Sequence, residues 1–151
     1  MNLIQVADFH KQYRETIAVA GLTFEVAPGA VLGLVGPNGA GKTTTLRALA
    51  GIIPPTRGRL LVAGYEVAAE PVAAKGQLAF IPDDPKLFDT LTVWEHLEFT
   101  ASVYRVHDYL QDANHLVEQF ELADKRHAVA QELSRGMRQK VAICCAYLHR
   151  P

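Results

Sequence analysis

The chain has 151 residues, 49% hydrophobic and 21% charged, which is the composition of an ordinary folded domain and excludes a disordered tail. A formal net charge of −1 gives no overall field that would attract nucleic acid or an anionic membrane. We expect neither secretion nor a membrane span, because an apolar leader and a run of about 18 apolar residues are both missing from the sequence.

The first half of the chain is predicted to be rich in strands. Period-two alternation and short apolar runs predict strands at residues 3–8, 21–26, 30–35, 59–62 and 78–81. Ala27–Ala30 predicts a tight hairpin turn, and residues 53–58 and 63–65 predict two further connections. We place the boundary of the first part of the molecule at residue 88.

The second half has a helical period. Thr92 and Glu95 predict a capping box at the start of a helix, a second helix starts near Asp108 and a third near Arg135. The predicted apolar stripes of these helices are Trp94, Leu97, Ala101 and Tyr104, then Leu110, Ala113, Val117 and Phe120, then Met137, Val141, Cys144 and Leu148. We expect Cys144 and Cys145 to be buried thiols without a disulfide.

A glycine-rich segment, GPNGAGKT from Gly36 to Thr43, matches the pattern of a phosphate-binding loop between a strand and a helix. Glycines let successive amides converge on phosphate oxygens, and the helix opening at Lys42 adds its positive end. The candidate ligands are Gly36, Asn38, Gly39, Ala40, Gly41, Lys42, Thr43 and Thr44. We expect residues 31–35 to be a buried strand, and Leu46, Leu49 and Ala50 to form the helix face that ends at Gly51.

The segment from Gln131 to Pro151, QELSRGMRQKVAICCAYLHRP, resembles the signature segment of ATP-binding cassette (ABC) proteins, whose usual core is Leu-Ser-Gly-Gly-Gln. Here that core reads Leu133, Ser134, Arg135, Gly136, Met137. The stretch LAFIPDDPKLFDTLTVWEHLEF is similar to the loop and helices that precede the signature in that family. The resemblance covers nearly the whole chain, starting from an aromatic residue at Tyr13.

The resemblance implies an α/β fold: a P-loop NTPase core with an antiparallel β subdomain and a helical subdomain, incomplete at the C-terminus. Residues 1–88 would be the nucleotide-binding core with the β subdomain, and residues 89–151 the helical subdomain. It also implies ATP and Mg²⁺ as cofactors. The implied roles are adenine stacking for Tyr13, catalysis for Lys42 and Asp83, metal ligation for Thr43 and Asp83, and contact with a partner's ATP for Ser134, Arg135, Gly136 and Met137.

Two residues depart from the family's pattern. Asp83 takes the place of a Gln that usually faces Mg²⁺ and the attacking water, and Asp83-Asp84-Pro85 is alternatively a polar turn. Arg135 takes the place of a Gly, which adds positive charge near the partner's phosphate but removes backbone freedom. Ser134 is alternatively an ordinary helix cap. The six histidines show no metal-site spacing and are expected at the surface or partly buried.

The resemblance implies the ATP-binding subunit of a transporter, which pairs with transmembrane permease subunits and forms a homo- or heterodimer, without nucleic acid. Its expected place is cytoplasmic, on the inner face of the cell membrane. The sequence ends before the family's Asp-Glu strand and later His, so we expect weak or absent hydrolysis and marginal stability. The alternatives are a non-catalytic nucleotide-binding fragment and, less favoured, a cassette ATPase of ribosomes or DNA repair.

Overall fold

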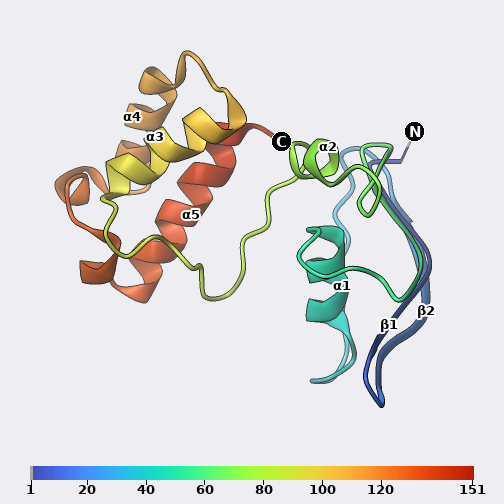
Figure 1. Ribbon diagram of the computed structural model, residues 1–151. Helices are drawn as coiled ribbons and strands as arrows, with labels where there is room; N and C mark the ends of the chain where they lie inside the picture. Colours follow the sequence, from blue (N-terminus) through green and yellow to red (C-terminus); the bar gives the residue numbers. More distant parts are fainter. Residues whose placement is uncertain (1) are drawn as a thin grey trace. The chain divides into compact units, whose positions relative to one another are not determined.

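The computed structural model describes residues 2–151 and divides into two compact units (Figure 1). The division falls between Leu78 and Ala79, ten residues before the boundary that the sequence suggested. Each unit has its own hydrophobic core and is described by itself.

The first unit is built on a four-stranded antiparallel sheet. Its strands are β1 (Ile4–Tyr13), β2 (Thr16–Val26), β3 (Arg57–Val62) and β4 (Tyr65–Glu66), in the spatial order β2-β1-β3-β4. Val6 of β1 lies opposite Phe24 of β2 and Leu60 of β3. Leu60 and Val62, two apart on β3, are both buried, as the period-two pattern requires. On β1 the buried residues Val6 and Phe9 are three apart, because a register shift lies between them, where Asp8 has a φ of 49°.

Helix α1 (Lys42–Leu49) packs on this sheet (Figure 1). Its buried residues are Thr45, Ala48 and Leu49. Gly51, at φ 64°, ends the helix, with Ile52 N–H donating to Arg47 O over 2.9 Å and Gly51 N–H donating to Ala48 O over 3.0 Å. This is the Schellman pattern, and it confirms the predicted helix end. The predicted apolar face is correct for Leu49 and Ala50 but wrong for Leu46, which lies exposed.

Two predicted strands are wrong. Residues 30–35 and 78–81 form no strand, and Val31 and Val35 are 99% and 96% exposed. The Ala27–Ala30 turn is present, with Ala30 N–H donating to Ala27 O over 3.1 Å, but an unpaired segment follows it instead of a hairpin strand. An apolar run favours extended backbone, whereas a strand also needs a hydrogen-bonded neighbour, and the described residues place none beside either segment.

Other boundaries differ in detail. Strand β2 begins at Thr16, not at the predicted Gly21. Gly21, at φ 83°, lies inside the strand as an extra residue between the paired Ala20 and Leu22. The short elements β4 and α2 (Pro71–Lys75) and the 3₁₀ turns η1 (Ala123–Lys125) and η2 (Ala130–Glu132) were not predicted.

The second unit consists of α3 (Val93–Tyr104), α4 (Tyr109–Gln119) and α5 (Arg135–His149), with α3 and α4 both packed on α5 (Figure 1). Its core contains most of the predicted stripe residues: Leu97, Ala101, Ala113, Val117, Val141, Cys144 and Leu148. Leu110 and Tyr104 are exposed, so their predicted burial is wrong. Within residues 2–151, no helix is long and apolar enough to cross a membrane.

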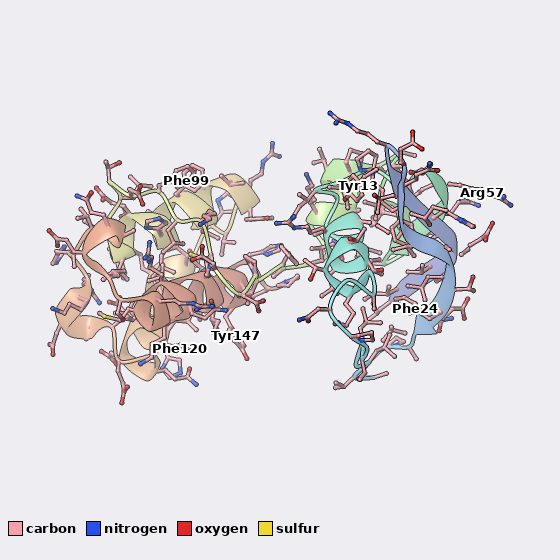
Figure 2. The ribbon with its side chains drawn as sticks, turned by 90° about the horizontal axis from the view of Figure 1, so that it is seen from below. Tyr13, Phe24, Arg57, Phe99, Phe120 and Tyr147 are labelled. Atoms are coloured by element: carbon pink, nitrogen blue, oxygen red, sulfur yellow. The ribbon has the colours of Figure 1, made fainter. Side chains whose placement is uncertain are left out.

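Phe120 and Tyr147, both labelled in Figure 2, belong to the edge of this packing. Their ring centroids are 6.2 Å apart, which joins the end of α4 to the last turn of α5. Phe120 is partly buried against the core, as its place in the predicted stripe requires, whereas Tyr147 is exposed.

The capping box of α3 is confirmed. Glu95 N–H donates to Thr92 Oγ1 over 3.2 Å, and Thr92 N–H donates to Glu95 Oε2 over 2.7 Å. The backbone hydrogen bond from Thr92, followed by its side-chain bond, lowers the pKa of the Glu95 carboxyl below its ordinary value. Local sequence therefore fixes where the first helix of this unit begins.

Candidate functional site

The glycine-rich loop takes the backbone form that its sequence requires. Gly39 and Gly41 have φ of 84° and 85°, in the left-handed region that favours glycine. A Cβ on Gly41 would lie 2.6 Å from Ala18 O and 2.8 Å from Val19 Cγ2, so only glycine lets the loop approach β2 this closely. A Cβ on Gly39 would meet nothing within 4 Å. The loop is therefore packed at Gly41 and open at Gly39.

Lys42 is folded over this loop. Its ammonium donates to the carbonyl oxygens of Gly36 and Pro37, each over 2.7 Å. Both acceptors are neutral, and an anionic phosphate oxygen accepts from an ammonium more strongly than a carbonyl does. The geometry therefore places a positive charge inside the loop, where a phosphate can compete for it.

The first turn of α1 is suited to an anion. Gly41 is its N-cap and provides no side-chain cap, and the first turn contains no acidic residue. The first amides of a helix have no intrahelical acceptor, and the helix dipole places partial positive charge there. Among the three threonines, Thr45 is buried and donates its hydroxyl to Gly41 O over 2.9 Å, whereas Thr43 is exposed.

A groove of about 410 Å³ lies beside the loop in the first unit. Its walls come from β2, the segment before the loop, the loop itself and α1. Residues lining it are Ile17, Ala18, Val19, Ala20, Gly21, Leu22, Leu34, Val35, Gly39, Ala40, Gly41, Lys42 and Thr45. The structure thus gathers four of the predicted ligands, Gly39 to Lys42, with a stretch of β2 that sequence reasoning had not assigned to the site.

Tyr13 lies at the end of β1, outside the described lining of the groove, and is 46% exposed (Figure 2). Its strand partner is Thr16, and the next pair along the hairpin places Gln12 opposite Ile17, which does line the groove. The register therefore places Tyr13 beyond one end of the groove. Sequence reasoning missed Lys11, two residues earlier, although the period of a strand puts positions 11 and 13 on one face.

The signature segment of the second unit forms the start of α5. Ser134 is its N-cap, and Ser134 Oγ accepts from Met137 N–H over 3.3 Å. A Cβ on Gly136 would meet nothing within 4 Å, so the surface over the first turn is open. The helix-cap interpretation of Ser134 is confirmed, and it is compatible with an anion approaching the same turn.

The loop that contains Asp83 is attached to α5. Arg135 Nη2 donates to Asp83 O over 3.2 Å, and Gln139 Nε2 donates to Pro82 O over 3.3 Å. Two predicted site residues from distant parts of the sequence, Asp83 and Arg135, are therefore neighbours within the second unit. Thr43 belongs to the first unit and Asp83 to the second.

Basic side chains surround the next residue of that loop. A hydrogen bond from Lys86 lowers the pKa of the Asp84 carboxyl below its ordinary value, and the charges of Arg138 and Arg135 add to the effect. Arg138 Nε is buried and has no hydrogen-bond partner among the described residues. The start of α5 therefore carries a net positive charge beside a carboxylate already paired with Lys86.

The histidine prediction is wrong for His96, which is 4% exposed and bonded through both ring nitrogens. In the described part of the chain, no group of three or more His, Cys, Asp or Glu side chains is arranged to hold a metal ion. Cys144 and Cys145 are free thiols; Cys144 is buried, as predicted, whereas Cys145 is only partly buried.

Comparison with known proteins gives consistent results. A family model described as "ABC transporter" matches residues 19–151. "ABC-type transporter ATP-binding protein EcsA" of Bacillus subtilis is 33% identical over 100% of this chain and 62% of its own length. "SkfA peptide export ATP-binding protein SkfE" of the same organism is 37% identical over 97% of this chain and 61% of its own length.

A solved structure titled "Structure of ATP binding subunit of ABC transporter" superposes with a TM-score of 0.92 and 35% identity, over 99% of this chain and 63% of the other. The fold is therefore that of an ABC ATPase domain, with an antiparallel sheet and a helical unit. The chain spans about 62% of the length of EcsA, the first of these relatives.

Proposed function

Because the chain belongs to the ABC transporter family, we propose that it is the ATP-binding part of a transporter ATPase, which binds Mg-ATP and contributes to ATP-driven transport across a membrane. The observation that carries this proposal is the loop geometry: two left-handed glycines, an uncapped helix start and the Lys42 ammonium within the same turn. These are the groups that bind a triphosphate in a P-loop.

Within the first unit, the loop from Gly36 to Thr44 holds the β- and γ-phosphates through the backbone N–H groups of its residues other than Pro37, which has none, with Asn38 and Ala40 among the donors. Lys42 exchanges its two carbonyl acceptors for phosphate oxygens. Thr43 is exposed in the first turn of α1, and its hydroxyl oxygen would be a ligand of Mg²⁺. Tyr13 offers its ring to the adenine beyond the end of the groove.

Within the second unit, the start of α5 binds the γ-phosphate of ATP held by a second ATP-binding subunit. Gly136 leaves the surface of this turn open, Ser134 caps it through Met137 N–H, and Arg135 with Met137 flanks it. Asp83 provides a carboxylate to Mg²⁺ and the attacking water, on a loop that Arg135 and Gln139 hold against α5. This attachment supports the proposal that the metal-facing loop and the signature segment act together.

The proposed partners are membrane permease subunits, which meet the exposed surface of the loop that follows Asp83. Phe88 and Phe99 are both exposed, with ring centroids 5.1 Å apart in an edge-to-face arrangement. This apolar pair on a short loop and α3 is suited to contact with an apolar segment of another subunit. In that assembly, the chain lies at the inner face of the membrane.

A second candidate function is nucleotide binding without turnover. Among the described residues that line the groove, Lys42 is the one titratable side chain, and none is acidic or histidine. Activating a water for attack needs a group that accepts a proton. The side chains that line the groove of the first unit therefore favour nucleotide binding over ATP hydrolysis by this unit alone.

Calorimetry with Mg-ATP and a phosphate-release assay on the same preparation test both candidates. Binding with release that Lys42→Ala abolishes supports the ATPase, and binding without release supports the binder. Absence of heat with folded protein at millimolar Mg-ATP contradicts both. Lys75→Ala, a change at an exposed lysine of α2, serves as the control for loss of charge.

A further inference from the structure

Lys11 is a charged residue in an unusual environment. It is 9% exposed, and its ammonium donates to Pro54 O over 2.8 Å. None of the ion pairs among residues 2–151 includes it. An ammonium without a carboxylate partner is costly to bury, so its surroundings must provide other compensation.

The aromatic ring of Tyr13 provides part of that compensation. Lys11 Nζ lies 4.9 Å from the centroid of the Tyr13 ring, within the range of a cation–π contact. The residues are two apart on β1, so both side chains project from the same face of the strand. The ammonium therefore lies against the ring of Tyr13, a residue that remains 46% exposed.

The acceptor of the Lys11 bond is itself fixed in place. Thr56 N–H donates to His10 O over 2.9 Å, and Gln12 N–H donates to Thr56 Oγ1 over 3.0 Å. These two bonds tie the loop that contains Pro54 to the end of β1. The same loop thus holds the head group of Lys11 and the backbone of its two neighbours, His10 and Gln12.

The same pair of strands leads to the phosphate loop. Lys11 lies opposite Val19 in the register of β1 and β2, and Val19 lines the groove beside Gly41. The pairing of β1 with β2 therefore fixes the distance between Tyr13, whose ring contacts Lys11, and the phosphate-binding turn. A ligand that spans both must present its flat part to the uncovered face of the ring.

We propose that Lys11 is a positioning residue for the base of the nucleotide: it covers and anchors one face of Tyr13, so that the base stacks on the other face. This inference rests on the proposed nucleotide-binding function. The nearby cation draws π density toward the covered face, which reduces repulsion between the open face and the π cloud of a base. The ordered ring also loses less side-chain freedom when the base binds.

Calorimetry on the 151-residue chain tests this with two ligands, Mg-ATP and Mg-tripolyphosphate, which differ by the presence of the nucleoside. Lys11→Met keeps an unbranched apolar stem and removes the ammonium, and Lys11→Gln replaces the ammonium with a neutral hydrogen-bond donor. Both variants are expected to bind Mg-ATP about three- to tenfold more weakly and Mg-tripolyphosphate as the wild type does. Lys11→Arg is expected to restore Mg-ATP affinity to within about twofold, since Arg also stacks on aromatic faces.

A double-mutant cycle with Tyr13→Ala separates positioning from a merely structural role. When Tyr13 is absent, Lys11→Gln should cause no further loss of Mg-ATP affinity. Equal loss for both ligands, or losses that add in the double variant, would overturn the proposal for Lys11 and leave the phosphate site intact. If the wild type binds neither ligand, the proposed function fails first, and this inference fails with it. Lys75→Met is the matched control and should bind both ligands normally.

Discussion

The backbone N–H of Phe88 donates to Nε2 of His96 over 3.0 Å. The other ring nitrogen, Nδ1, lies 2.7 Å from Thr92 O, so a neutral ring that carries its proton on Nδ1 satisfies both contacts. The ring also stacks on Phe88, with centroids 6.1 Å apart. One buried side chain thus ties the loop before α3 to the first turn of that helix, and orders the exposed Phe88 that we propose for partner contact.

Replacing His96 with leucine should remove both side-chain bonds and leave the Phe88 amide without its partner, whereas Thr92 O keeps the bond from the backbone N–H of residue 96. We expect a loss of about 1–3 kcal/mol in the free energy of unfolding of the second unit. Urea unfolding followed by the fluorescence of Trp94, the single tryptophan, measures it. His115→Leu, at an exposed position of α4, should change the midpoint little; an equal effect of both substitutions would contradict the assigned role of His96.

Alanine substitutions at Gly41 and Gly39 should have unequal effects on the first unit. Both residues have positive φ, which costs an alanine roughly 1–2 kcal/mol. Only at Gly41 does the new methyl group also collide with Ala18 O and Val19. We therefore expect Gly41→Ala to destabilise the unit clearly more than Gly39→Ala, as measured by urea unfolding followed by circular dichroism. Equal stabilities of the two variants would show that the loop does not pack against β2.

The capping box predicts a dependence of stability on pH. The pKa of Glu95 is lowered in the folded state from its ordinary 4.5, so its contribution is complete above that value and is lost as the pH falls through the folded pKa. Glu95→Gln should therefore remove part of the acid destabilisation seen by Trp94 fluorescence below about pH 4.5. Glu118→Gln, outside the box on α4, is the comparison, and an unchanged acid profile in Glu95→Gln contradicts the assignment.

The thiol of Cys144 should be inert in the folded protein. Burial raises its pKa to about 12, and burial also raises the pKa of Cys145. Since the thiolate is the reactive form, labelling with a disulfide reagent at pH 8 should be slow in buffer and rapid for both thiols in urea. Above the ordinary cysteine pKa, the unfolded chain ionises first, so stability should fall as the pH rises further. Rapid labelling of the folded protein would contradict the packing of α5 against α4.

Two exposed valines precede the phosphate loop, and replacing them should change association but not stability. Val31 and Val35 are almost fully exposed, so Val31→Thr together with Val35→Thr should leave the urea midpoint nearly unchanged. The same change should reduce association at high concentration, because it removes an apolar patch beside unpaired backbone. Sedimentation of both proteins measures this, and a large drop in the urea midpoint would show that these valines are buried in solution.

Sequence patterns predicted well those features that depend on neighbours along the chain. The Thr92–Glu95 box and the Gly51 helix end each involve residues within a few positions of each other. Features that depend on distant partners were missed. The apolar run at residues 30–35 indicated a strand, but pairing depends on which other segment lies beside it.

The contacts that position the proposed site residues also connect distant segments. Lys11 binds Pro54 across 43 positions, and Arg135 binds Asp83 across 52. The period of a strand puts positions 11 and 13 on one face, but the sequence analysis did not single out Lys11, and nothing in the spacing indicated that its ammonium would be buried over the ring. The family resemblance points to the proposed site residues, and the folded structure shows which neighbours hold them.

The central claim is that the amides from Gly39 to Thr44, together with the Lys42 ammonium, form a cradle for the phosphates of a nucleotide. The most direct measurement is a titration of the ¹⁵N-labelled chain with Mg-ATP, followed by its amide resonances. We predict that the resonances of Gly39, Gly41, Lys42 and Thr43 shift together, and that Lys42→Ala suppresses these shifts. Saturable shifts confined to other segments, or no shifts in a folded protein, would contradict the claim.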